Sequence, residues 1–188
     1  MYENADFKKG LKIMVEGSPY VIIDFQHVKP GKGNQFSRTK MRNLLTGQLL
    51  ERTFKSGERF EVPDVVNREM TYLYKDDSGY TFMDQENYEQ ITVLESEIGD
   101  AKNYLVENLK VTILFYNDRP VTCDVPKAVN LKVALTDPGL KGDTVSGTTK
   151  PATLESGLIV KVPLHINIGD LLRIDTESGN YVERVNQK

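Results

Sequence analysis

Residues 11–28 read LKIMVEGSPYVIIDFQHV, with an apolar run on either side of Gly17-Ser18-Pro19. Short runs rich in Val, Ile and aromatic residues and bounded by turn residues are typical of β-strands. Glycine and proline so close together indicate a tight turn. The stretch therefore predicts a β-hairpin, and the segments that follow it continue the pattern of short strands at 34–45, 49–55 and 59–66.

The rest of the chain repeats this pattern of strands and turn signals. Residues 70–84 predict a hairpin that turns at 76–79, and residues 110–126 predict another that turns at Asn117-Asp118. A helix is predicted only at 95–105, where the apolar period is weak. The last third adds four predicted strands at 130–137, 157–166, 170–177 and 180–185.

Short strands at this spacing predict an all-β fold. Three stretches of about 60 residues, each with four or five strands, favour three small β-barrels over one sandwich. The predicted boundaries fall beside prolines in VPDVV and DVPKAVN. We therefore expect domains at 1–64, 65–127 and 128–188, and because such small domains have modest cores, we expect them to share interfaces.

Composition places the chain in an ordinary class. It has 188 residues, of which 39% are hydrophobic and 27% charged, and no run of about 18 apolar residues that would span a membrane. The first ten residues lack the apolar core of a signal peptide, so we expect a cytoplasmic protein with no membrane partner. The single cysteine, Cys123, fits a reducing compartment and is interpreted as a packing residue.

Charge is distributed unevenly along the chain. The net charge is −3, but residues 1–64 carry +3, residues 65–127 carry −6 and residues 128–188 are neutral. No acidic residue occurs between Asp24 and Glu51, where the cations Lys29, Lys32, Arg38, Lys40 and Arg42 gather. A basic arm on an acidic chain indicates a polyanionic partner. A solvated strand face would give the same composition, so this alternative stays open.

The sequence offers no catalytic or metal-binding pattern. His27 and His165 lie far apart, and Cys123 has no histidine near it in sequence. Residues 142–147 have the glycine spacing of a phosphate loop, but threonines stand where its Lys-Ser/Thr pair is needed, which excludes this class of NTPase. The acids of the middle third are interpreted as solvated turn residues: Asp76, Asp77, Asp84 and Glu86. We therefore expect no enzyme, cofactor or metal.

Residues 29–33 read KPGKG and predict an exposed turn. Pro30 fixes φ for the second position of a tight turn, and Gly31 is expected to supply a positive φ. Lys32 should then project from the tip of a hairpin, with Gly33 removing steric cover. Such an ammonium can reach into a narrow crevice or accept a covalent modification. A solvated lysine is the alternative from composition alone.

A second unusual loop is predicted at 137–153, DPGLKGDTVSGTTKPAT. Its exposed amides and hydroxyls suit contacts with phosphate or sugar. A merely flexible connection explains the same composition, and both interpretations remain open.

Taken together, the motifs resemble those of the bacterial translation elongation factor P family along the whole chain. The matching stretches occur in family order: DFKKGLKIMVEG, VKPGKG, RTKMRNLLTG, ERTFKSGE, TYLY, FMD, TDPGLKGDT, KPATLESG and YVERV. KPGKG alone would be a weak signal, whereas this series of motifs is highly specific.

The resemblance implies an N-terminal SH3-like, KOW-type barrel followed by two OB-folds, arranged as an L that approximates the outline of a tRNA. It also implies binding to the 70S ribosome between the peptidyl and exit sites, beside the peptidyl-tRNA. Members of this family stimulate peptide bond formation when ribosomes stall at consecutive prolines. The implied partners are therefore the ribosome with its rRNA and the peptidyl-tRNA, and a monomer is expected.

The resemblance also assigns roles to residues. Lys32 stands where the family has its tip residue, which reaches toward the peptidyl-transferase centre and is extended by a lysine-modifying enzyme with β-lysine or an aminopentanol group. A branch with a rhamnosylated arginine does not match Lys32. The family's exit-site mRNA loop corresponds to Gly142, Asp143, Thr144 and Gly147. Charge makes Lys29, Arg38, Lys40 and Arg42 the candidates for tRNA and rRNA phosphates.

Two alternatives remain at this point. An elongation-factor-P-like paralogue would share the architecture, although the unaltered KPGKG tip favours the standard factor. An unrelated OB-fold module for single-stranded nucleic acid would need aromatic stacking platforms and a basic groove. Residues 65–188 instead carry a net charge of −6.

Overall fold

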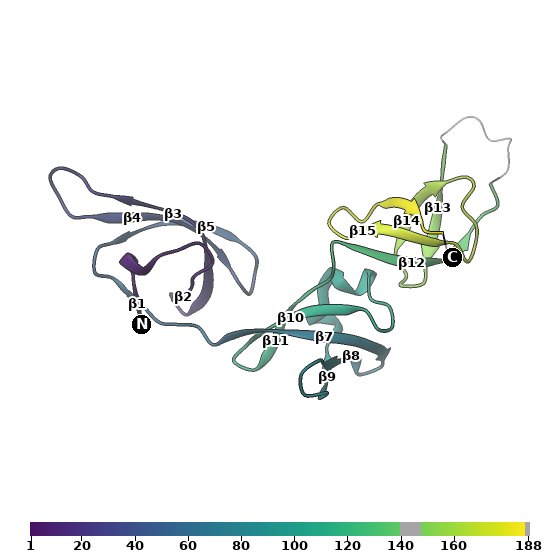
Figure 1. Ribbon diagram of the computed structural model, residues 1–188, viewed down its shortest axis with the longest axis horizontal. Helices are drawn as coiled ribbons and strands as arrows, with labels where there is room; N and C mark the ends of the chain where they lie inside the picture. Colours follow the sequence, from purple (N-terminus) through teal and green to yellow (C-terminus); the bar gives the residue numbers. More distant parts are fainter. Residues whose placement is uncertain (140–147, 187–188) are drawn as a thin grey trace. The chain divides into compact units, whose positions relative to one another are not determined.

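The computed structural model describes residues 1–139 and 148–186, and most of its regular structure is β (Figure 1). Its contacts divide the chain into two compact units. Unit 1 comprises Met1–Val65 with Tyr116–Asp118, and unit 2 comprises Val66–Phe115 with Arg119–Lys188. The sheets are short and curled, which confirms the predicted all-β class built from small barrels.

Unit 1 is built on a four-stranded antiparallel sheet. Its strand order is β2-β3-β4-β5, and the strands span Lys12–Val15, Ser18–Val28, Phe36–Asn43 and Leu49–Lys55. A second, two-stranded sheet pairs β1 with β6, which span Tyr2–Glu3 and Arg59–Phe60. This pairing brings the start of the chain beside the end of the first 60 residues.

The first hairpin turns one residue earlier than predicted. Val15 pairs with Ser18, so the turn consists of Glu16 and Gly17, with φ of 49° and 79°. Two successive positive φ values match the twist of the flanking strands in a two-residue hairpin. Ser18 and Pro19, which the sequence placed in the turn, are the first residues of β3.

The core of unit 1 follows from the alternation of β4. Ser37, Thr39, Met41 and Asn43 are buried, while the residues between them are exposed. Met41 packs in a cluster whose centre is aromatic: the rings of Phe54 and Phe60 lie 4.8 Å apart. Because successive side chains of a strand point to opposite faces, the burial of one set places the other set in solvent.

Unit 2 is built mainly on two five-stranded sheets, the second of which is antiparallel throughout. In the first, the order β11-β10-β7-β8-β9 corresponds to Arg119–Asp124, Lys110–Tyr116, Val65–Asp76, Gly79–Asp84 and Gln90–Val93. In the second, the order β14-β13-β12-β15-β16 corresponds to Ile159–Pro163, Thr149–Leu154, Ala128–Thr136, Leu171–Asp175 and Tyr181–Arg184. The predicted hairpins at 70–84 and 110–126 are confirmed.

Each sheet of unit 2 covers its own hydrophobic cluster, and the two clusters share neighbours. Leu109 and Val125 pack against both, and Tyr104 is buried in the second. These shared side chains explain why the two sheets form one compact unit. The division into domains at 1–64, 65–127 and 128–188 stays a prediction.

Helices are short. The predicted helix at 95–105 is present only as one turn, α1 at Glu95–Ile98, followed by a 3-10 helix, η2, at Gly99–Asn103. Gly99 has a φ of 59° and a ψ of −143°, which are not helical values, so α1 ends before it. Another 3-10 helix, η1, spans Asn4–Asp6. In the described part of the chain, no helix is long and apolar enough to cross a membrane.

Candidate functional site

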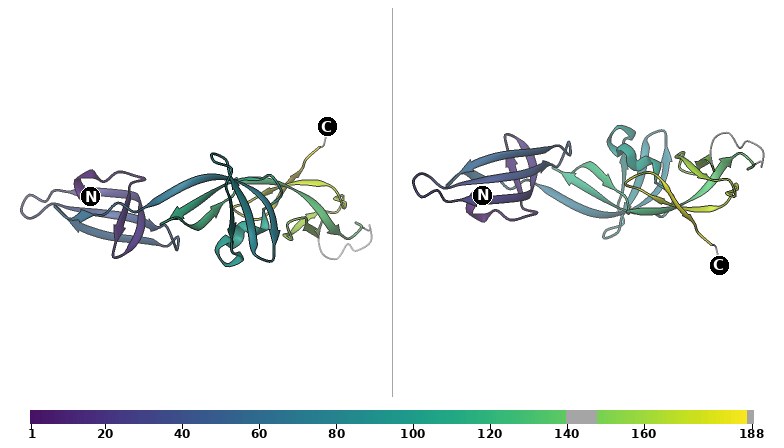
Figure 2. Two further views of the ribbon diagram at one scale, coloured as in Figure 1. Left: turned by 90° about the horizontal axis from the view of Figure 1, so that it is seen from below. Right: turned by 90° about the horizontal axis from the view of Figure 1, so that it is seen from above.

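The β3–β4 hairpin carries the loop that contains Lys32. Its last paired residues are Val28 and Phe36, so residues 29–35 form the loop, and all of them are exposed. In both views of Figure 2, this loop extends beyond the rest of unit 1. Lys32 has no hydrogen-bond or ion-pair partner among the described residues. The predicted placement of Lys32 on an exposed hairpin loop is therefore confirmed.

The backbone of the loop differs from the prediction at its glycines. Gly33, with φ of 119°, has the positive φ, and Gly31 does not. A Cβ added at Gly31 would meet nothing within 4 Å, whereas one at Gly33 would lie 3.8 Å from the Pro30 Cγ. The conformation of unit 1 itself therefore requires glycine at position 33 but not at position 31.

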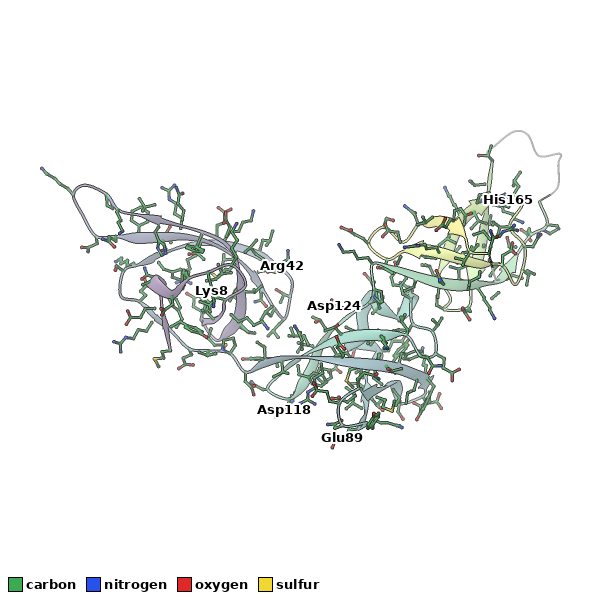
Figure 3. The ribbon with its side chains drawn as sticks, viewed as in Figure 1. Lys8, Arg42, Glu89, Asp118, Asp124 and His165 are labelled. Carbon is green, nitrogen blue, oxygen red and sulfur yellow. The ribbon has the colours of Figure 1, made fainter. Side chains whose placement is uncertain are left out.

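The three cations predicted on β4 lie on one face. Arg38, Lys40 and Arg42 alternate with buried residues and are exposed, so they form a row along the strand. The Arg38 guanidinium lies 5.9 Å from the centre of the Phe36 ring. Figure 3 shows Arg42 at the end of the hairpin remote from the loop. We call these three residues the basic row.

The register of the sheet balances the charge of only one member of the basic row. Lys40 lies opposite Asp24 on β3 and opposite Glu51 on β5, with 4.0 Å between its Nζ and a Glu51 oxygen. Arg38 faces Gln26 and Thr53, and Arg42 faces Val21 and Leu49. The two arginines thus have no acidic cross-strand neighbour in this sheet.

Asp24 forms an ion pair with Lys9 on another segment of unit 1. Its carboxylate lies 3.0 Å from the Lys9 Nζ, and this hydrogen bond and charge lower the pKa of Asp24. Both side chains are exposed, so solvent screens the pair. Asp24 therefore stays ionised and reduces the positive potential at the middle of the basic row.

The second predicted loop is shorter than expected. Residues 149–153 belong to β13, and the proposed mRNA-contacting residues Gly142, Asp143, Thr144 and Gly147 lie outside the described residues. The prediction of a loop to 153 was wrong because Pro151 and the threonines around it conceal the strand.

The described ends of this segment are held by side chains. Lys150, which is 7% exposed, donates from Nζ to the Asp137 carbonyl at 2.5 Å. In the reverse direction, the Thr136 hydroxyl donates to the Pro151 carbonyl at 2.9 Å. These two side-chain bonds join Thr136, the last paired residue of β12, and the following Asp137 to residues of β13.

Cys123 and the two histidines lie in different surroundings. Burial, with a smaller effect of Asp124, raises the pKa of the Cys123 thiol to about 12, and Cys123 packs against the first cluster of unit 2. His27 lies in unit 1 and His165 in unit 2. No three metal-ligating side chains gather within residues 1–139 and 148–186.

Sequence reasoning missed the residues that surround the base of the loop. Asn4 and Ser56 lie beside His27 and Gln35, although they are distant from them in the sequence. No local signal in the sequence indicates this proximity, because it arises from the long-range pairing of β4 with β5 and of β1 with β6.

The fold and the exposed hairpin define a class: proteins of small β-barrels that carry a row of exposed cations on one hairpin strand. Family models place the chain within it. An elongation factor P KOW-like domain matches residues 3–60, an elongation factor P OB domain matches 65–123, and an elongation factor P C-terminal domain matches 129–184.

Curated relatives match over the full length. The chain is 72% identical to elongation factor P of Bdellovibrio bacteriovorus, with 100% of both chains covered, and 50% identical to elongation factor P 2 of Geobacter sulfurreducens, with 98% and 99% covered. A solved translation initiation factor eif-5a family protein from Naegleria fowleri shares the fold, with a TM-score of 0.53 at 17% identity over 66% of this chain and 96% of that one. The chain belongs to the elongation factor P family of translation factors.

Proposed function

We propose that this translation factor binds the 70S ribosome between the peptidyl and exit sites and stimulates peptide bond formation at consecutive prolines. The observation that carries the proposal is Lys32, an unpaired ammonium on an exposed hairpin loop of a chain in this family. In this role, Lys32 reaches toward the peptidyl-transferase centre and is the substrate of a lysine-modifying enzyme.

The mechanism needs no catalytic group from the protein. The ribosomal RNA carries out the reaction, so a factor accelerates it by holding the peptidyl-tRNA in a reactive orientation. Orientation contributes up to about 7–11 kcal/mol in favourable model reactions, so a small fraction of that value is enough to relieve a stall. Proline is a poor reactant because its ring fixes φ.

The remaining site residues bind nucleic acid in this proposal. Lys29 and the basic row contact phosphates of the tRNA acceptor arm and rRNA, and Pro30, Gly31 and Gly33 shape the tip. Gly142, Asp143, Thr144 and Gly147 contact the mRNA in the exit site. The protein acts in the cytoplasm as a monomer.

A translation assay with a polyproline reporter tests the role of the tip. Lys32→Ala should abolish most of the relief of stalling, while Lys161→Ala, an exposed lysine of β14, should behave as wild type. Intact mass of the protein from native cells should place any mass increment on Lys32. Equal relief by the Lys32→Ala variant and wild type would remove the tip from the mechanism.

A binding experiment tests the basic row. Arg38→Gln with Arg42→Gln should weaken binding to stalled ribosomes and lower the slope of log affinity against log salt by about one per phosphate lost. Lys40→Gln should weaken binding as well, because it leaves Asp24 and Glu51 unopposed beside the arginines. The matched control is Lys132→Gln with Lys161→Gln, which removes two exposed charges of β12 and β14 outside the proposed interface. Affinities and slopes equal to wild type in the double arginine variant would exclude the row from the interface.

A further inference from the structure

A small polar pocket lies beside the base of the hairpin loop. Its volume is about 210 Å³, and it is confined to unit 1. Three parts of the chain supply its polar lining: η1, the two ends of the hairpin loop and the residue after β5. These polar residues are Asn4, His27, Lys29, Gln35, Ser37 and Ser56.

Backbone and side-chain hydrogen bonds fix the walls of this pocket. The Ser56 amide donates to the Gln35 carbonyl at 3.0 Å, and the Asn4 side-chain amide donates to the Lys55 carbonyl at 3.0 Å. The pairing of Val28 with Phe36 closes the end of the hairpin. The pocket is therefore formed before any ligand binds.

His27 is held so that one ring nitrogen remains available. Its Nδ1 lies 2.7 Å from the hydroxyl oxygen of Ser37, a residue with no exposed surface. The Phe25 ring packs edge-on against the imidazole, with 5.1 Å between the ring centres. Only Nε2 of His27 is left for a ligand in the pocket, and it donates when Ser37 donates to Nδ1.

The lining of the pocket offers hydrogen-bond donors and no acidic group. Lys29, Gln35 and Ser56 supply an ammonium, an amide and a hydroxyl, and none of these groups has a partner among the described residues. The pocket contains no carboxylate, whereas two other surface depressions include Asp24 with Glu51 and Glu107. A lining that offers donors and no acid suits an anion with several acceptor oxygens.

We propose that this pocket binds a phosphodiester group of RNA next to the tip. The inference rests on the proposed function and deepens it, because it adds His27, Gln35 and Ser56 to the contacts that charge alone suggests. One ammonium with neutral donors is the chemistry that recognises a single phosphate and its ribose. The preformed walls fix the RNA strand relative to Lys32.

An isosteric charge change tests the pocket. Gln35→Glu places a carboxylate among the donors, while Gln48→Glu makes the same change on an exposed residue between β4 and β5, away from the pocket. Against stalled ribosomes, Gln35→Glu should bind about five- to tenfold more weakly, with a salt slope smaller by about one. Gln48→Glu should keep the wild-type slope, and equal losses in the two variants would overturn the assignment.

Nuclear magnetic resonance tests the pocket without the ribosome. On titration with an RNA minihelix of the tRNA acceptor arm, the side-chain amide of Gln35 and the ring of His27 should shift, and the Gln48 amide should not. Wild-type relief of stalling with no shift at Gln35 or His27 overturns the pocket but leaves the proposed function intact. If Lys32→Ala relieves stalling as well as wild type, the proposed role of the tip is wrong, but the titration still measures whether the pocket binds RNA.

A protein partner is the other outcome. If Gln35→Glu binds ribosomes as Gln48→Glu does but slows the mass increment on Lys32, the pocket is a contact for the modifying enzyme. That result would overturn the RNA assignment.

Discussion

Thr39 permits a direct test of the packing in unit 1. Its side chain lies on the inward face of β4 and is 2% exposed, and its hydroxyl has no hydrogen-bond partner among the described residues. A buried hydroxyl without a partner costs about 1–3 kcal/mol of stability. Thr39→Val replaces the hydroxyl with a methyl group of similar shape. We expect the free energy of unfolding to rise by about 1–2 kcal/mol.

Thr81 supplies the matched control for this substitution. It is also a buried residue of a strand, β8, and is 4% exposed, but its hydroxyl lies 3.3 Å from the Thr92 hydroxyl. Thr81→Val removes a hydrogen bond that contributes about 0.5–1.5 kcal/mol. The same chemical change should therefore stabilise the protein at position 39 and destabilise it at position 81.

Hydrogen exchange of the full-length protein measures both effects. Amides of β4 report the opening of unit 1, and amides of β8 report the opening of unit 2. A gain of about 1.4 kcal/mol slows exchange through opening by about tenfold. Faster exchange of β4 amides in Thr39→Val would refute the reasoning, because the hydroxyl would then have a partner such as an enclosed water.

Two further perturbations test unit 2. Gly139→Ala should lower its melting temperature because a Cβ there overlaps the Leu164 carbonyl oxygen; Gly31→Ala, which meets nothing within 4 Å, should not change the melting profile in scanning calorimetry. Burial, assisted by Asp124, raises the pKa of Cys123 from 9.0 to about 12, so above pH 9 the unfolded thiol loses a proton that the folded one keeps. The free energy of unfolding, measured by urea titration at several pH values, should fall between pH 9 and 12, and it should fall less steeply in Cys123→Val. An equal decrease with pH in the two proteins would contradict this.

The strands that could be predicted are those with a local signature. Asn117 and Asp118 both have positive φ, of 48° and 60°, and these residue types tolerate that conformation, so the turn was evident from the sequence. The first hairpin was predicted one residue late because Ser18 and Pro19 also suit turns. Local propensity located these turns, and cross-strand register fixed their limits.

Where tertiary contacts decide the structure, the sequence was misleading. β13 was hidden because a proline and several threonines resemble a loop, but Pro151 pairs with Lys161 and the strand is held between β12 and β14. The positive φ at Gly33 and not at Gly31 depends on how the whole loop closes between Val28 and Phe36. Neither feature follows from residue type alone.

The candidate site likewise has features that follow from the local sequence and features that depend on tertiary contacts. The sequence selected Arg38, Lys40 and Arg42 by charge and placed them in a predicted strand. The structure adds that they alternate with buried residues and so share one exposed face. The pocket beside the tip was not predictable, because Asn4 and Ser56 reach it only through long-range strand pairing.

The register of the sheet determines which cations of the basic row have acidic neighbours, which a count of charges along the sequence does not show. In the sequence, the three cations of the basic row look equivalent, since no acid lies near them along the chain. In the sheet, Asp24 on β3 and Glu51 on β5 lie on either side of Lys40. Strand pairing therefore brings two acids next to Lys40 that are distant from it along the chain. Arg38 and Arg42 keep their charge unopposed by cross-strand neighbours, and a guanidinium can bind a phosphate with two parallel hydrogen bonds. The attraction of this face for RNA should therefore come from its two arginines, with the lysine between them serving to keep two acids from opposing it.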